Sequence, residues 1–183
     1  MIAEIDVRAV LSRSGCEFHS DLVTRSTGRA VRSGIEAHLQ EHPDVSVVVL
    51  DFSAVRVLDC SCADEVVAQL LRRSAPGAGG PAAFLVLRGL DEVHADQIDQ
   101  VLRRQDLALV AEERGGGRRL LGRVGELTRA AWERVARRGS AAAEDVASEL
   151  ACSLDDARDA LDELVGRRLV TRAADQYFPL PAA

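Results

Sequence analysis

The sequence predicts an α/β domain over residues 1–120, with a mixed sheet and packed helices, followed by a smaller helical domain over residues 121–183. The length of 183 residues suits one large domain or two small ones. Strand-like apolar runs alternate with helical patterns up to about Gly122, and the pattern becomes helical near Gly125. Strands separated by helices imply crossover connections, and hence a parallel or mixed sheet.

The elements expected in the first domain follow from apolar periodicity and from the residues that end each run. Strands are expected at Asp44–Phe52, Ala83–Leu87 and Leu107–Ala111. The first is a nearly continuous β-branched run, which is typical of a strand buried on both faces. Helices are expected at Arg25–Gln40, Ala63–Leu71 and Asp91–Arg104. Glycine-rich turns are expected at Pro76–Pro81 and Arg114–Arg119.

The third of these helices is expected to turn Val93, Ile98, Val101 and Leu102 toward the core. The first ends before Pro43, where His38 and His42 are expected to be solvated or to cap its C-terminus. Neither GxGxxG after a strand nor GxxxxGK[ST] occurs. A dinucleotide-binding or P-loop fold is therefore not expected.

In the second domain, apolar residues recur at helical spacing in three segments. The expected helices are Glu126–Arg138, a helix capped by Ser140 and ending at Leu150, and Leu154–Val165, capped by Ser153 and ended by Gly166. Two short strands, Leu169–Arg172 and Gln176–Leu180, would form a hairpin.

Composition restricts the function classes. The net charge of −6 and the aromatic content of 3% argue against an electrostatically driven nucleic-acid binder. No apolar run is long enough to span a bilayer, and the N-terminus lacks the pattern of a secretory signal. The cysteines are too few and scattered for a disulfide framework. We therefore expect a reduced, cytoplasmic protein with no membrane contact.

The three helices and hairpin of the second domain resemble the winged helix-turn-helix domains of bacterial transcription regulators. The matching segment is SAAAEDVASELACSLDDARDALDELVGRRLV. Winged helices also serve as protein-docking modules. The expected third helix carries five carboxylates against Arg158 alone, which would repel a phosphate backbone. Protein docking or dimerisation is therefore favoured over DNA binding. The arginines that could contact a nucleic acid are Arg158, Arg167, Arg168 and Arg172.

The segment LDFSAVRVLDCSCADEV resembles the strand–turn–helix centre of STAS domains, the fold of anti-anti-sigma factors. The closer resemblance is to a STAS-like family of unknown function, which carries Ser-Phe-Ala-Asp-Glu at this place. Here the match is Ser61 to Glu65, with Cys62 in place of Phe, which implies a buried apolar role for Cys62. Upstream, TRSTGR (residues 24–29) resembles that family's segment opening the helix before the central strand.

This resemblance implies protein–protein regulation without catalysis. In anti-anti-sigma factors, an ATPase of the histidine-kinase superfamily binds the STAS domain and phosphorylates a serine at the helix start. That serine directly follows the Asp, a position held here by Cys60, and Ser61 comes one residue later. Ser61 is therefore the candidate phosphorylation site, although a helix N-cap is the favoured role for it. The expected partner is such an ATPase or another regulatory complex. The residues expected to bind it are Thr24, Arg25, Arg29, Cys60, Ser61, Asp64 and Glu65.

Other chemistry is less well supported. Cys60-x-Cys62 with Cys16-x-x-His19 could suggest zinc, but C-x-C at a helix start points its side chains apart. Asp51 and Asp59 are expected to bond loop amides. No Ser–His or Cys–His catalytic pattern is found. We expect no metal, no cofactor and no enzyme activity.

The sequence thus predicts a regulatory adaptor that acts by partner switching. The alternative is a DNA-binding winged-helix transcription regulator with a STAS-like sensor domain. The sequence does not decide whether the chain forms a homodimer. A small enzyme or ligand sensor is the least favoured interpretation.

Overall fold

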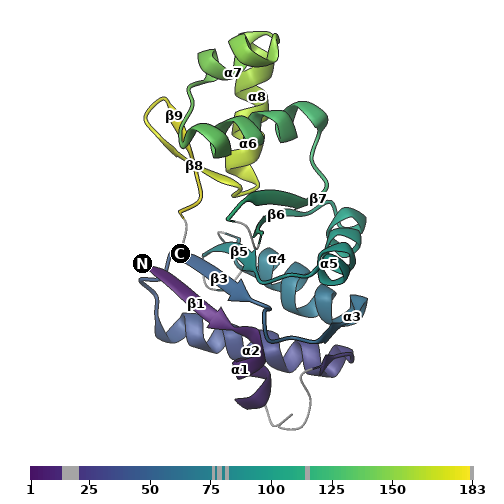
Figure 1. The fold of residues 1–183 in the computed structure, drawn as a ribbon. Coiled ribbons are helices and arrows are strands. Elements are labelled where there is room, and N and C mark those ends of the chain that lie inside the picture. The colour runs from purple at the N-terminus through teal and green to yellow at the C-terminus, as the bar shows by residue number, and fades with distance from the viewer. Residues whose placement is uncertain (14–20, 76, 78–79, 81–82, 114–115, 182–183) are drawn as a thin grey trace.

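The computed structural model describes residues 1–13, 21–75, 77, 80, 83–113 and 116–181 (Figure 1). The chain has a mixed α/β fold around a five-stranded sheet with the order β1-β3-β5-β6-β7. The strands are β1 (Ile2–Asp6), β3 (Val47–Asp51), β5 (Phe84–Arg88), β6 (Ala108–Glu112) and β7 (Arg118–Gly122). β1, β3, β5 and β6 run parallel, and β7 runs antiparallel to β6. The expected mixed sheet is confirmed.

Strand β3 is buried on both faces, as its β-branched run predicts. Val48 and Leu50 belong to one core, and Val47 and Val49 belong to the other. This division follows from the alternation of side chains along a strand. The sheet therefore separates two hydrophobic cores.

The first core lies between the sheet and the helices of the N-terminal half. These are α1 (Val7–Arg13), α2 (Arg25–Glu41), α3 (Cys60–Ala63), η1 (Asp64–Gln69), α4 (Leu70–Arg73) and α5 (Glu92–Arg104). α3, η1 and α4 follow one another without a break, and η1 is a π-helical turn. A short parallel ladder joins β2 (Asp21–Leu22) to β4 (Val57–Leu58), just before α3. At the end of α2, His42 Nδ1 donates to the carbonyl oxygen of His38 at 2.8 Å, which confirms the capping role.

The second core joins the opposite face of the sheet to the C-terminal part of the chain. That part contains α6 (Glu126–Arg138), α7 (Ala143–Leu150), α8 (Leu154–Gly166) and the hairpin of β8 (Val170–Ala173) with β9 (Gln176–Pro179). Val49 and Val110 of the sheet share a cluster with Trp132 and Leu161. In Figure 1 this part lies above β6 and β7. Both parts of the chain therefore contribute to this second core.

Several elements were not expected from the sequence. No regular structure was expected at β1 and α1. A turn was expected where β7 begins. Arg118 and Arg119, placed in a glycine-rich turn, open β7, because Leu120 and Leu121 pack into the two cores. Residues 114–115 of that turn, Cys16, His19 and most of Pro76–Pro81 fall outside the described residues.

Three details of the helices correct the sequence-based expectations. Ser140 does not cap α7, because Ala141 is bridged to Tyr177, and the helix starts after Ala142. Val93 is exposed, and His94 and Ala95 are buried instead, because the N-cap at Asp91 sets where α5 begins. Gly166 is the last residue of α8, and the left-handed conformation falls on Arg168.

Among the described helices, none has both the length and the apolar character needed to cross a bilayer.

Candidate functional site

The two segments that were singled out from the sequence meet where the start of α2 packs against the start of α3. The Sγ of Cys62 donates to the carbonyl oxygen of Thr24 at 2.9 Å. Arg25 Nη1 lies 2.7 Å from Asp64 Oδ2 and 3.1 Å from Glu65 Oε1. Residues almost forty positions apart in the chain thus form one cluster.

Gly28 lets the two helices come this close. A Cβ at this position would lie 3.0 Å from the Cα of Cys62 and 3.0 Å from the Cβ of Glu65, which is tighter than an ordinary van der Waals contact. The glycine of the TRSTGR segment therefore has a structural role in forming the site.

Asp59, not Ser61, is the N-cap of α3. Its Oδ1 accepts hydrogen bonds from the backbone N–H of Cys62 and from the hydroxyl of Ser61, both at 2.8 Å. The capping role expected for Ser61 is wrong, because the helix already begins at Cys60. The role of the two aspartates in shaping loops is confirmed, since Asp51 Oδ1 also accepts from the N–H of Ser53 at 2.7 Å. Ser61 lies half-buried in the first turn.

Glu65 is the most deeply buried charge of the site, with 5% of its surface exposed. Arg25 and Arg32 donate to its carboxylate, and Arg29 Nη2 lies 3.6 Å from it. A buried carboxylate needs such partners, because leaving water costs it several kcal/mol. The side chains of Arg25 and Arg29 are nevertheless 52% and 64% exposed. The cluster thus presents positive charge to solvent above a buried negative charge.

Asp64 beside it is held ionised by its neighbours. Burial favours the protonated form of its carboxyl, but hydrogen bonds from Arg25, Gln105 and Gln69 outweigh burial and lower its pKa below the ordinary value. The shortest of these bonds, from Arg25 and from Gln105 Nε2, both measure 2.7 Å. Asp64 therefore links α2 to the C-terminal end of α5.

Five members of this network were not expected from the sequence: Arg32, Glu36, Gln69, Arg73 and Gln105. Arg32 bonds to both Glu65 and Glu36, and Arg73 Nε donates to Glu36 Oε1 at 2.6 Å. A usable signal was present: Arg25, Arg29, Arg32 and Glu36 recur at intervals of four, three and four residues, which places them on one helix face.

The two cysteines of the site differ in environment. Burial, reinforced by the charge of Asp59, raises the pKa of the Cys62 thiol to about 11. Cys62 is fully buried, as its replacement of Phe implied. The Sγ of Cys60 donates to Gln97 Oε1 at 2.5 Å and is half-buried. Within the described part of the chain, no group of three or more His, Cys, Asp and Glu side chains could hold a metal ion.

The four arginines proposed for nucleic-acid contact fall into two pairs. Arg158 and Arg172 line a cavity of about 330 Å³ beside α8 and the hairpin, and each faces a carboxylate, Glu144 and Asp162 respectively. Arg167 and Arg168 instead turn toward the N-terminal half. Arg167 donates to the carbonyl oxygen of Asp106, and Arg168 to that of Ser74.

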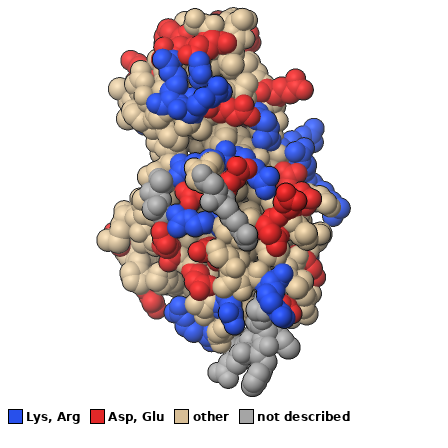
Figure 2. Space-filling view, in the orientation of Figure 1, with Lys and Arg blue, Asp and Glu red and all other residues tan. Residues whose placement is uncertain are grey.

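Charges of both signs are interspersed on the face of the molecule drawn in Figure 2. The chain matches no protein-family model, no curated protein and no solved structure.

Proposed function

We propose that the chain is a non-enzymatic regulatory adaptor that acts by partner switching, in the manner of STAS-like regulators. Its docking site is the surface formed by the starts of α2 and α3. The observation that supports this most is the Arg25–Asp64–Glu65 cluster, which joins the two segments that resemble the family. Because Arg25 and Arg29 are half exposed above it, they are available to an acidic group of a partner.

Ser61 would be the switch. Its hydroxyl bonds to Asp59, and Asp64 and Glu65 follow it on the same helical stretch. A phosphate would add up to about two negative charges, break the bond to Asp59 and repel an acidic partner. The enzyme that adds it would be an ATPase of the histidine-kinase superfamily, which would also be the docked partner.

The C-terminal part would act as a winged-helix docking module. Three helices followed by a two-stranded hairpin support this assignment. α8 exposes Asp155, Asp156 and Asp159, which favours a protein over a phosphate backbone as the partner.

A DNA-binding transcription regulator is the second candidate. The cavity that holds Arg158 and Arg172 between α8 and the hairpin favours it, because a winged helix reads DNA with these elements. The internal hydrogen bonds of Arg167 and Arg168 count against it, since they occupy part of the donor capacity of both guanidiniums.

Affinity capture from the source cells, with and without nuclease, tests the proposal. We expect a histidine-kinase-superfamily ATPase to co-purify regardless of nuclease. Ser61→Asp should reduce its recovery at least about tenfold, as expected for an unfavourable charge at an interface centre. Ser12→Asp, on the exposed surface of α1, is the matched control and should leave recovery unchanged.

Recovery of discrete DNA fragments only without nuclease, and their loss with Arg172→Ala, would reject the adaptor proposal in favour of the DNA-binding regulator. Equal recovery of the ATPase by wild type and Ser61→Asp would remove the proposed switch.

A further inference from the structure

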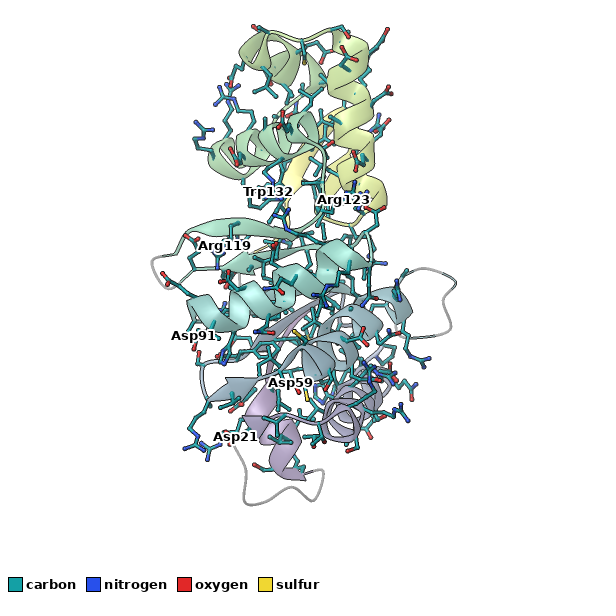
Figure 3. The ribbon with its side chains drawn as sticks, turned by 90° about the vertical axis from the view of Figure 1, so that its right-hand side faces the viewer. Asp21, Asp59, Asp91, Arg119, Arg123 and Trp132 are labelled. Carbon is teal, nitrogen blue, oxygen red and sulfur yellow. The ribbon has the colours of Figure 1, made fainter. Side chains whose placement is uncertain are left out.

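A cavity of about 370 Å³ lies between the start of β7 and α6. Residues 116–118 line one wall. α6 lines the other wall with two pairs of side chains, each pair one helical turn apart: Trp132 with Ala136, and Glu133 with Arg137. Figure 3 shows Trp132 on the side of α6 that faces β7. We call this space the α6 cavity.

The indole of Trp132 brings an unused hydrogen-bond donor to the α6 cavity. The residue is 3% exposed and belongs to the second core. Its Nε1–H donates to no group within the described part of the chain. Because the N–H of a buried indole usually finds an acceptor, an oxygen atom of a ligand in the cavity would complete its bonding.

Two opposite charges on the rim of the α6 cavity are also unpaired. Glu133 and Arg137 are exposed and lie four residues apart on α6, a spacing at which such side chains can pair. Among the described residues, neither lies within ion-pair distance of an opposite charge. The third charge of the cavity, Arg118, is already bonded to Glu112 at 2.9 Å. The cavity therefore offers one free anion and one free cation.

The surroundings of Arg137 leave its positive charge uncompensated. Its neighbours Arg134 and Arg138 both bond to Glu149. Burial lowers the pKa of Arg134, and the positive charges of Arg137 and Arg138 lower it further. A negative group beside Arg137 would offset this repulsion, and a guanidinium can hold a carboxylate through two parallel hydrogen bonds. Arg137 therefore fits the carboxylate of a ligand.

We propose that the α6 cavity binds a small zwitterion of the α-amino acid class. Arg137 and the indole N–H hold its carboxylate, Glu133 holds its ammonium group, and its side chain packs against Ala136 and the indole ring. Neither a simple anion nor a simple cation would satisfy both free charges. The volume suits a small organic ligand, since ligand pockets typically measure about 300–1,000 Å³. None of the described lining residues belongs to α2 or α3, so the site does not depend on the proposed adaptor.

Isothermal titration calorimetry of the purified full-length chain with each standard amino acid in turn tests this site. We expect at least one of them to bind with a dissociation constant below about 1 mM and to change the fluorescence of Trp132, the only tryptophan. The matching carboxylic acid without the amine, and the matching amine without the carboxylate, should each bind at least about tenfold more weakly.

Variants of α6 locate the binding. Arg137→Gln and Glu133→Gln should each raise the dissociation constant at least about tenfold, as expected for the loss of a charged hydrogen bond. Ala136→Met, which fills the cavity and keeps both charges, should abolish binding. Arg104→Gln, at an exposed position of α5 with no ion-pair partner in the described structure, is the matched control and should bind like wild type.

Absence of binding by every amino acid would overturn the proposal, as would binding that the three α6 variants leave unchanged. Equal binding of the carboxylic acid that lacks the amine would reject a zwitterion in favour of an organic anion. These results leave the proposed adaptor untouched, because its test is recovery of the ATPase.

Discussion

At the scale of single residues, two neighbouring carboxylates control the candidate site. Glu65 is buried and shared among arginines of α2, and Asp64 is bonded from α2, α5 and its own helical stretch. The sequence placed both acids at the site, but their roles depend on Arg32 and Gln105. Helical spacing places Arg32 on the same helix face as Arg25 and Arg29, but no local pattern connects Gln105 to Asp64, because these two residues approach only in the folded chain.

Acid should destabilise the protein partly through Asp64. The pKa of Asp64 is lowered in the folded state. Its contribution to the free energy of unfolding is therefore present above about pH 4, the ordinary pKa of an aspartate in the unfolded chain, and is lost as the pH falls through the lower pKa of the folded state. Urea unfolding between neutral pH and about pH 2.5 measures this. Asp64→Asn should lower the free energy of unfolding by about 1 kcal/mol at neutral pH and flatten its decline in acid.

The exposed turn residue Asp175 is the control for this effect. Asp175→Asn should leave both the neutral stability and the acid decline unchanged. An Asp64→Asn profile parallel to wild type would show that other carboxyls produce the acid dependence.

At the scale of elements, the site depends on how closely α2 approaches α3. A Cβ on Gly28 would crowd Cys62 and Glu65, and η1, a π-helical turn, directly follows α3. π-helical turns are rare and are often found at functional sites. The sequence predicted both helices, but nothing in its periodicity revealed the π-helical turn or the distance between the helices.

Replacing Gly28 by alanine should separate these helices. Alanine normally stabilises a helix interior by up to about 1 kcal/mol relative to glycine, but the crowding here should reverse the sign and cost about 1–3 kcal/mol. Thermal and urea unfolding measure the change. Gly166→Ala, in α8, meets no atom within 4 Å and should be neutral or stabilising. Equal effects of the two substitutions would contradict the close packing at Gly28.

At the scale of the whole molecule, the sheet joins the two halves of the chain. Its second face is buried by Trp132, Leu161 and their neighbours, and Arg168 stacks 4.4 Å from the centre of the Phe84 ring. Arg129 also donates to the carbonyl oxygens of Leu120 and Gly122 in β7, an edge strand of the sheet. These contacts bind the C-terminal part to the sheet by apolar packing and by hydrogen bonds.

The protein should therefore unfold in a single cooperative transition. Trp132 is the only tryptophan and lies buried in the shared core, so its fluorescence reports on the C-terminal part and the sheet together. Far-UV circular dichroism reports on all the helices. The urea unfolding transitions followed by fluorescence and by circular dichroism should coincide. A fluorescence change at clearly lower urea would show that the C-terminal part unfolds separately from the sheet.

The sequence by itself determined what depends on neighbours along the chain. Apolar periodicity, together with caps such as Ser153, located α2, α5, α6 and α8, and the β-branched run located β3. Only the tertiary structure decided that β7 forms an edge of the sheet, that Asp59 rather than Ser61 caps α3, and that Arg167 and Arg168 bond to carbonyl oxygens of the N-terminal half. The reason is physical: periodicity and capping act within a few residues, whereas strand pairing, charge neutralisation and burial depend on partners that only the folded chain brings together.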